Sequence, residues 1–317
     1  MLRGKGFAER VAPLIDALDG TSTVDELGER FPDLVPAVLD GLLKRGLLIE
    51  GDPEGDHGAP ALTAAALAEF APPGEVRQRL SRACVAVVGC GPVSATAAMH
   101  LAKAGVGRLL LCDGGQITAR EVIVSPNLSA NTAGCPRADS VQALCHEAGG
   151  VSVEVVNAPL ESDLITTTQL LLIEARYGRA PCAPEEADVA LAKGVPYMVH
   201  SQDALEAIVG PVVRPGGEPC HHCVDSRRLS HVNDLDEFLA YREQRGTTTP
   251  MPDAFLAAHT SFVAGLVANE ALRVLVKAPQ RTEGGALVID LATMTLEREE
   301  VLLVPGCPGC ATAPSDD

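Results

Sequence analysis

The chain has 317 residues, enough for one large domain and one small domain. Hydrophobic residues make up 46% of it, which is enough for a full core. Because aromatic residues make up only 3%, we expect that core to be mainly aliphatic. A formal net charge of −17 argues against non-specific binding to nucleic acid or to anionic membranes. We find no uninterrupted apolar run long enough to cross a bilayer, and the first ten residues lack the apolar run of a signal peptide. We therefore expect a cytoplasmic protein that binds neither nucleic acid nor membrane.

The N-terminal segment, residues 1–50, is predicted to be a separate unit. Apolar residues recur at helical spacing in three stretches, and Thr23 with Glu26 has the spacing of a capping box at the start of the second helix. A short apolar stretch with strand character follows the third helix. The expected helices and strand cover residues 7–18, 24–31, 34–45 and 47–49. Three helices followed by a strand predict a small winged-helix-like module.

Winged-helix modules often bind DNA, and a helical oligomerisation cap is the other simple role for such a unit. The only basic residues of its third helix, Lys44 and Arg45, lie at the end of that helix. Together with the negative net charge, this makes DNA the weaker alternative. Residues 51–80 are predicted to be a connecting segment, a Gly- and Pro-rich linker over 51–60 followed by helices over 61–70 and 75–82.

The stretch from Arg82 to Asp113 has the pattern of strand, glycine turn, helix and strand. Its first strand is a run of consecutive apolar residues, as expected for a strand buried on both faces. Gly89 and Gly91 form the turn, and Asp113 follows the second strand. In α/β nucleotide-binding folds such glycines let backbone N–H groups approach a phosphate, and such an acid accepts hydrogen bonds from ribose hydroxyls. Ser94 stands at the third glycine position of the motif.

Helices and strands alternate through most of residues 81–310. This alternation predicts an α/β fold with a Rossmann-like, doubly wound and mostly parallel sheet. The expected helices cover residues 136–148, 185–193, 234–246 and 254–276, and the expected strands cover residues 151–156, 170–173, 195–201 and 208–213. Residues 287–290 and 295–304 are predicted to close the domain as an antiparallel hairpin. Residues 114–128 are expected to be irregular, and residues 311–317 to be a disordered tail.

Two Cys-x-x-Cys pairs are the strongest chemical pattern in the chain. They are Cys220 with Cys223 and Cys307 with Cys310. Four thiolates are the usual ligand set of a closed structural zinc site, so we expect zinc with a stabilising and not a catalytic role. The alternatives are two unrelated turns or disulfides, and His221 and His222 could replace a thiol. Of the other six cysteines we expect five to be small buried hydrophobes and consider only Cys182 as a possible nucleophile.

The glycine turn, the Ser125–Leu128 segment (sequence SPNL) and the two cysteine pairs together resemble the ThiF-type, ubiquitin-activating-enzyme-like superfamily, over residues 80–310. The resemblance implies an enzyme that binds ATP and magnesium and adenylates a carboxyl terminus. Gly89, Gly91, Asp113, Asn127 and Leu128 match the motifs of this family. The departures are Ser94 for the third glycine, Gly115 for a second acid, Ala130 for an arginine, Asn131 for a glutamine and Arg137 for a lysine.

The magnesium-binding aspartate of this family would follow the strand over residues 170–173, where Glu174 is the only nearby carboxylate and is displaced from the expected position. Adenylation needs cations at the α-phosphate and a metal that bridges the phosphates. We therefore expect a degenerate member with no catalytic residues of its own. Its vestigial nucleotide site comprises Gly89, Gly91, Ser94, Asp113, Asn127 and Arg137.

The N-terminal helices resemble the helical part of the peptide-recognition elements of ribosomal peptide pathways, including those of thiopeptides. The resemblance implies a homodimeric protein that binds the leader of a precursor peptide and presents it to a YcaO-type cyclodehydratase, which forms azolines. Such an element normally begins with a β-hairpin whose edge receives the leader. Here residues 2–7 leave room for one short strand, so we expect a shortened element.

Two other functions remain open at this stage. An active adenylating enzyme acting on a peptide carboxylate would need Arg137 in the role of the lysine, with Arg120 or Arg176 near the phosphate. A nicotinamide-dependent oxidoreductase would account for the glycine turn alone and would leave both cysteine pairs unexplained.

Overall fold

The computed structural model describes most of the chain and divides it into two compact units, residues 1–78 and 79–317. The described residues are 7–43, 48, 58–156, 159–175, 185–214, 216, 219–230, 232–240 and 255–310. The predicted tail over 311–317 lies outside them, and so does the predicted strand over 47–49 except for Leu48, which lies in a bend.

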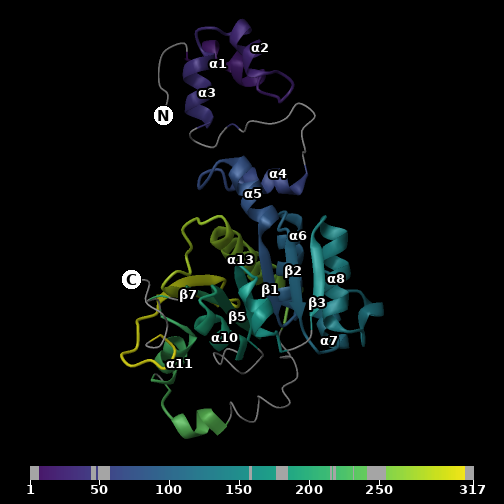
Figure 1. Ribbon diagram of the computed structural model, residues 1–317, viewed down its shortest axis with the longest axis vertical. Coiled ribbons are helices and arrows are strands. Elements are labelled where there is room, and N and C mark those ends of the chain that lie inside the picture. The colour runs from purple at the N-terminus through teal and green to yellow at the C-terminus, as the bar shows by residue number, and fades with distance from the viewer. Residues whose placement is uncertain are drawn as a thin grey trace. The chain divides into compact units, whose positions relative to one another are not determined.

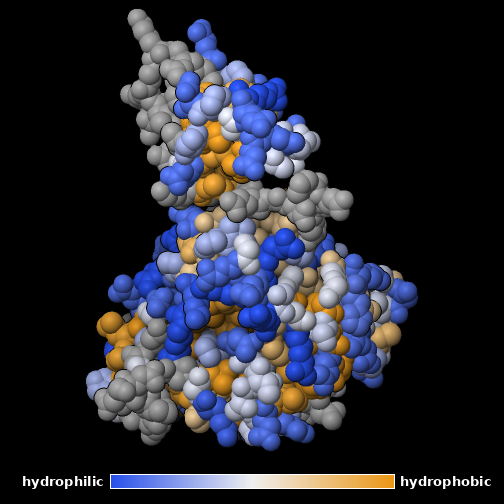
Figure 2. All heavy atoms as spheres, turned by 45° about the horizontal axis from the view of Figure 1, so that its top comes forward, coloured by the Kyte–Doolittle hydropathy of each residue, from blue (hydrophilic) through white to orange (hydrophobic). Residues whose placement is uncertain are grey.

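The N-terminal unit contains α1 (Phe7–Asp16), α2 (Val24–Arg30), α3 (Val35–Leu43) and α4 (Ala59–Ala66), and α5 (Pro73–Arg82) begins within it. The predicted capping box is confirmed: the Glu26 N–H donates to Thr23 Oγ1 at 3.2 Å, and the Thr23 N–H donates to Glu26 Oε2 at 2.7 Å. Leu14, Leu27 and Leu39 are buried at the centre of the first three helices. Partly buried apolar side chains surround them, and Figure 2 shows apolar atoms gathered on one face of this unit.

The second unit is built on one eight-stranded sheet of order β3-β2-β1-β4-β5-β6-β7-β8. Its strands are β1 (Cys84–Val88), β2 (Arg108–Cys112), β3 (Ser152–Val156), β4 (Leu170–Glu174), β5 (Tyr197–Asp203), β6 (Glu206–Val213), β7 (Gly285–Asp290) and β8 (Thr295–Glu300). The pairings from β3 to β5 are parallel, and those from β5 to β8 are antiparallel. The α/β fold and the closing hairpin are confirmed, within a sheet that is mixed.

Helices cover both faces of this sheet, as a doubly wound fold requires (Figure 1). α6 (Pro92–Lys103), α8 (Arg137–Ala148) and α13 (Ala257–Leu275) pack together, and α9 (Ser162–Thr166) packs against α10 (Glu185–Lys193). α11 (His221–Leu229) begins directly after Cys220 and contains Cys223 in its first turn. Among the described helices, none combines the length and apolar character that a membrane crossing requires.

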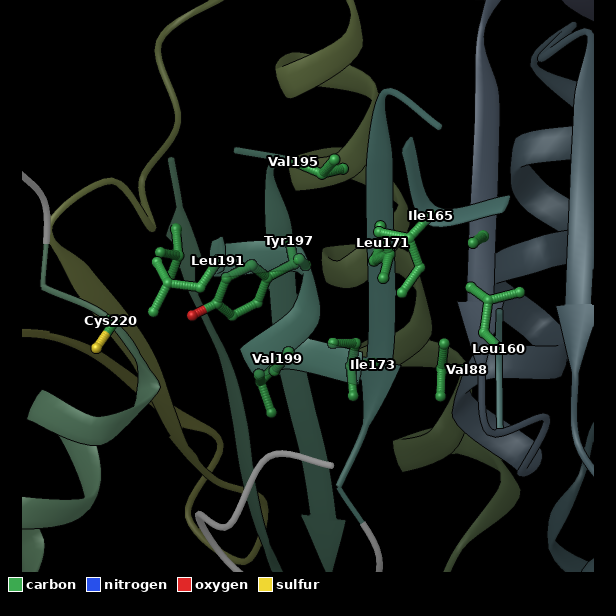
Figure 3. Close-up of a cluster of buried hydrophobic side chains, with 14 of the residues drawn as sticks. Val88, Leu160, Ile165, Leu171, Ile173, Leu191, Val195, Tyr197, Val199 and Cys220 are labelled. Carbon is green, nitrogen blue, oxygen red and sulfur yellow. The ribbon is translucent and has the colours of Figure 1, made fainter. Parts of the chain in front are cut away.

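The core between the sheet and α9 and α10 is a cluster of fully buried aliphatic side chains (Figure 3). Leu171 and Ile173 of β4 contribute to it, since a strand covered on both faces turns apolar residues to each side. Tyr197 of β5 is the largest buried side chain, and Figure 3 shows its hydroxyl directed toward the Leu191 and Cys220 end of the cluster. The core therefore extends to the cysteine pairs and places a buried hydroxyl beside them.

The expectation of irregular structure throughout residues 114–128 is wrong in part, because α7 (Ala119–Val124) forms there. Thr118 caps this helix. Its hydroxyl accepts a hydrogen bond from the Glu121 N–H at 3.2 Å, and its own N–H donates to Glu121 Oε2 at 2.6 Å. The same Thr-x-x-Glu spacing that predicted α2 is present here and could have revealed α7.

Candidate functional site

The glycine loop, residues 89–91, follows β1, the strand at which the order of strand addition in the sheet reverses. β1 is flanked by β2 on one side and β4 on the other, so the loop after β1 is at the topological switch point where open α/β sheets bind ligands. Gly89 takes φ +82°, and its N–H donates to the Cys112 carbonyl at 2.9 Å. Gly91 is the N-cap of α6, which begins at Pro92. The predicted glycine turn and the helix that follows it are therefore present.

The backbone donors of this loop are bound by carboxylates of the protein itself. The Cys90 N–H donates to Asp113 Oδ2 at 2.7 Å, and the Gly91 N–H donates to Glu174 Oε2 at 2.7 Å. A Cβ at position 91 would lie 2.5 Å from Glu174 Oε2, so glycine is required for this approach. Amides of this kind at a helix start are the groups that would receive a phosphate. In this protein the amides of Cys90 and Gly91 already donate hydrogen bonds to carboxylates.

Glu174 therefore contacts the glycine loop through its side chain, whereas from the sequence it was considered only as a displaced metal ligand. It ends β4, and its side chain hydrogen-bonds with Ser94 as well as with Gly91. Burial raises the pKa of the Glu174 carboxyl to about 7, against the opposing effects of Ser94, Gly91 and Arg137. Close to neutral pH the Glu174 side chain therefore changes between its protonated and its ionised form while it lies against the amide of Gly91.

Ser94, at the position of the third glycine, extends the contact from the loop to the next strand. Its hydroxyl lies 3.1 Å from Nε2 of His200, which is 1% exposed and belongs to β5. Burial lowers the pKa of His200 to about 4, so the ring is neutral at physiological pH. Its Nδ1 has no hydrogen-bond partner among the described residues. His200 was not predicted as a site residue, because a single histidine in a strand of mixed polar and apolar residues belongs to no recognisable motif.

Arg137 begins α8 and is held by two acids. Its Nη1 donates to both carboxylate oxygens of Asp113 at 2.8 Å, and its Nη2 lies 3.0 Å from Glu121 Oε1. Burial alone would raise the pKa of Asp113, but Arg137 and the loop amide of Cys90 outweigh it and hold that pKa below its ordinary value. A Cβ at position 115 would lie 2.6 Å from Arg137 Nη1, so Gly115 provides the space for the guanidinium.

The remaining predicted nucleotide residues are distributed around this cradle. Asn127 donates from Nδ2 to Thr96 Oγ1 of α6 at 3.1 Å, which ties its segment to the helix behind the glycine loop. Ala130 lies on the surface in a short 3-10 helix (Ala130–Thr132). Residues 176–184, among them Arg176 and Cys182, lie outside the described part of the chain, whereas Glu174, the only carboxylate near the expected place of the magnesium ligand, lies within it.

The two cysteine pairs come together, although 83 residues of sequence separate them. Cys220 Sγ lies 3.6 Å from Cys307 Sγ, and Cys223 Sγ lies 3.4 Å from Cys310 Sγ. All four sulfur atoms lie within 4.8 Å of one another. Tetrahedral zinc with Zn–S bonds of about 2.3 Å places sulfur atoms about 3.8 Å apart, so the cluster is close to that arrangement. The four thiols could therefore hold one metal ion.

The environment of these thiols also suits a metal. Cys220, Cys223 and Cys307 are buried, and all four cysteines are free of disulfides. Burial raises the pKa of the Cys307 thiol, but N–H groups of Cys310 and Gly309 and the neighbouring thiols outweigh it and lower that pKa to about 7. The Val304 N–H also points at Cys223 Sγ at 3.4 Å. Backbone donors of this kind orient thiolate ligands and stabilise their charge.

Known proteins are similar to this chain over most of its length. Residues 63–309 match the ThiF family. The vegetative HesA protein of Trichormus variabilis is 26% identical over 245 residues, which cover 75% of this chain and 84% of that protein. The molybdopterin-synthase adenylyltransferase of Salmonella typhimurium is 26% identical over 240 residues, which cover 74% of this chain and 90% of that enzyme.

Solved structures share the fold. The crystal structure of E. coli MccB with MccA-N7isoASN has a TM-score of 0.69 at 17% identity, covering 94% of this chain and 90% of MccB. PaaA has a TM-score of 0.66 at 18% identity, covering 87% of this chain and 96% of that chain.

Proposed function

Since this chain belongs to the ThiF family, we propose that it is a leader-peptide-binding scaffold that presents a ribosomal precursor peptide to a YcaO-type cyclodehydratase for azoline and azole formation, without adenylation chemistry of its own. The observation that carries the proposal is the occupancy of the glycine loop. Glu174 and Asp113 accept the hydrogen bonds of the Gly91 and Cys90 amides.

Electrostatics at the loop supports the loss of adenylation. An ATP phosphate would approach a cradle that already contains two acidic side chains, and like charges repel strongly where water is excluded. Arg137, which lies at this site, is bound to Asp113 and Glu121, so its charge is neutralised by the protein. The residue at the position of the family arginine, Ala130, offers no donor side chain. ATP and magnesium are therefore not expected as cofactors, and the residual nucleotide site is vestigial.

Peptide binding is assigned to the N-terminal unit. Its helices leave apolar side chains partly exposed around the buried core, and an amphipathic or extended peptide can pack against such a surface. The structures of E. coli MccB that share the fold include one with N-formylated MccA, the peptide named with that enzyme. We assign residues 1–50 to peptide recognition, residues 51–80 to the connection and residues 81–310 to the ThiF domain, in a cytoplasmic homodimer.

Zinc at Cys220, Cys223, Cys307 and Cys310 is proposed to be structural. Four thiolates complete a tetrahedral shell and leave no position for substrate. The ion would join the start of α11 to the segment after β8, two parts of the chain that lie far apart in sequence. The ion is expected to stabilise the folded protein and to fix the position of these two segments.

Binding of the leader is tested with fluorescein-labelled leader peptides of any short Cys-, Ser- and Thr-rich precursor that is found encoded beside this gene. Fluorescence polarisation should show saturable binding to the full-length protein. A Leu34→Glu variant, which alters the partly buried apolar surface of the N-terminal unit, should weaken it at least about tenfold. Leu62→Glu is the matched control, because Leu62 is 66% exposed on α4 of the same unit. No binding to any of these leaders, or equal losses in both variants, would contradict the proposal.

An adenylating enzyme that acts on a peptide carboxylate is the second candidate. It is favoured by the retained Gly89, Gly91 and Asp113 geometry and by the shared fold of MccB, which has been crystallised with ATP. ATP–pyrophosphate exchange with the same peptides separates the two functions. A scaffold gives no exchange above a no-peptide control, whereas exchange that depends on peptide would establish the enzyme and remove the first proposal.

A further inference from the structure

Three metal-ligating side chains converge beside the four-cysteine cluster without belonging to it. His221 and His222 begin α11, and Asp188 lies on α10. Both imidazole Nε2 atoms lie against the same oxygen, Asp188 Oδ1, at 3.1 Å for His221 and 2.7 Å for His222. The three ligand atoms lie within 4.8 Å of one another. Neither histidine takes the place of a thiol in the cysteine cluster.

The inner histidine is fixed in a ligating orientation by a buried tyrosine. Tyr197 Oη lies 2.6 Å from Nδ1 of His221, and the two rings meet edge to face. This contact sets the ring so that Nε2 faces Asp188. A hydrogen bond from the second ring nitrogen to a protein oxygen is the usual support of a metal-bound histidine. Since a hydroxyl both donates and accepts hydrogen bonds, the Tyr197 oxygen can accept a hydrogen bond from the His221 Nδ1–H when Nε2 binds a metal.

Among the described residues, no arginine or lysine is paired with the Asp188 carboxylate. In the described part of the chain its ion-pair partners are the two imidazoles, which carry charge only when they are protonated. Two neutral imidazoles and one carboxylate form a ligand set of net charge −1, which a divalent cation complements. With metal–nitrogen and metal–oxygen bonds of about 2.0–2.2 Å, tetrahedral geometry needs ligand atoms about 3.3–3.5 Å apart. The present distances need only small side-chain adjustments to reach that value.

We propose that Asp188, His221 and His222 form a second metal site that binds Zn²⁺ or a similar transition-metal dication. Nitrogen and carboxylate ligands favour such ions over Mg²⁺ and Ca²⁺, which prefer oxygen. Three protein ligands leave a position for water or another exchangeable ligand, in contrast to the closed cysteine cluster.

The site opens from the interior toward solvent. The side chain of His221 is 6% exposed, that of His222 is 34% exposed and that of Asp188 is 55% exposed. The ion is therefore anchored on its inner side and accessible on its outer side. Exchange with chelators should be faster here than at the buried thiolates, which allows the two sites to be loaded and emptied separately.

The test measures metal content and ligand type in the full-length protein. After equilibration with Zn²⁺ and removal of free ion, the wild-type protein should contain about two zinc ions per chain, and His222→Ala and Asp188→Asn should each contain about one. In titrations, the affinity of the second site should fall at least about tenfold in both variants. Both side chains are partly exposed, so the variants should retain the circular dichroism of the wild type.

Cobalt distinguishes the two sites, because Co²⁺ bound to thiolates has strong sulfur-to-metal charge-transfer absorption, and Co²⁺ bound to nitrogen and oxygen lacks it. The variants should keep the charge-transfer bands and lose only the cobalt bound without them. His146→Ala, at an exposed histidine of α8, and Asp163→Asn, at an exposed aspartate of α9, are the matched controls and should keep both ions. One ion per chain in the wild type, or a second ion kept equally by Asp188→Asn and His222→Ala, would overturn the proposal.

Discussion

The Glu174→Gln substitution removes a titratable group from the glycine loop and keeps its shape. The Glu174 side chain contacts the Gly91 N–H and the Ser94 hydroxyl, with the charges of Arg137 and Asp113 nearby. Burial raises the pKa of its carboxyl from 4.5 to about 7. In the unfolded chain the carboxyl is exposed and regains its ordinary pKa. Between these two pKa values the folded protein holds a proton that the unfolded chain releases.

The sign of the effect follows from this difference in bound protons. The free energy of unfolding decreases as the pH rises from about 4.5 to about 7, because the unfolded state binds fewer protons than the folded state in that interval. The separation of the two pKa values corresponds to about 3 kcal/mol, at about 1.4 kcal/mol for each pH unit. Glutamine carries no charge, so the stability of the variant relative to the wild type should increase by about 3 kcal/mol across this interval.

His200, on the neighbouring strand, contributes with the opposite sign. Burial lowers its pKa from 6.5 to about 4, so between these values the unfolded chain binds the extra proton and the free energy of unfolding increases with pH. In the wild type the slopes of Glu174 and His200 nearly cancel between about pH 4.5 and 6.5. Of these two groups the Glu174→Gln variant keeps only His200, so its stability should rise more steeply with pH than that of the wild type in this range.

Urea unfolding followed by circular dichroism, between about pH 4.5 and 8, measures this difference. Glu147→Gln, at an exposed glutamate of α8, controls for the loss of a surface carboxyl. A difference between Glu174→Gln and the wild type that stays constant across the pH range would refute the assignment of Glu174 as a buried group that binds a proton near neutral pH.

Three further changes have defined outcomes. Cys307→Ser should abolish metal binding at the cysteine cluster and lower stability by about 4 kcal/mol where free zinc is a thousandfold above its dissociation constant, as measured by metal content and thermal unfolding. Tyr197→Phe should weaken the second metal site by about tenfold in zinc titrations while the thiolate charge-transfer bands of cobalt remain. Thr23→Ala should destabilise α2 by about 1 kcal/mol, seen as faster hydrogen exchange in residues 24–30, with Thr21→Ala outside the capping box as control.

The architecture was predictable because its determinants are local and strong. The apolar run that forms β1 and the glycines after it predict a buried strand and a phosphate-type turn from a few neighbouring residues. The capping box at Thr23 fixed the start of α2 in the same way. The cysteine pairs were informative for another reason, since four thiols in two Cys-x-x-Cys units suggest one ion even when the chain between them is long.

The details of both sites depend on distant contacts and could not be obtained from sequence. Glu174 is 83 residues from Gly91, and only the pairing of β1 with β4 brings its carboxylate to the loop amide. Asp188 is 34 residues from His222 and reaches it because α10 and the start of α11 lie side by side. No spacing rule connects an acid in one helix with a histidine in another. The sequence pointed to the glycine loop and to the cysteine pairs, whereas the contacts of Glu174 and Asp188 depend on the fold.

Two departures from the family motifs prove to be one structural change. Gly115 replaces an acid and Arg137 replaces a lysine, and the guanidinium of Arg137 occupies the space that a side chain at position 115 would need. An acid restored at position 115 would bring its Cβ within 2.6 Å of Arg137 Nη1 and within 3.0 Å of Asp113 Oδ1. It would therefore displace the arginine that now neutralises Asp113 and add negative charge beside Asp113. Because these residues depend on one another, the altered cradle is a stable arrangement of its own that reversion at a single position would disrupt.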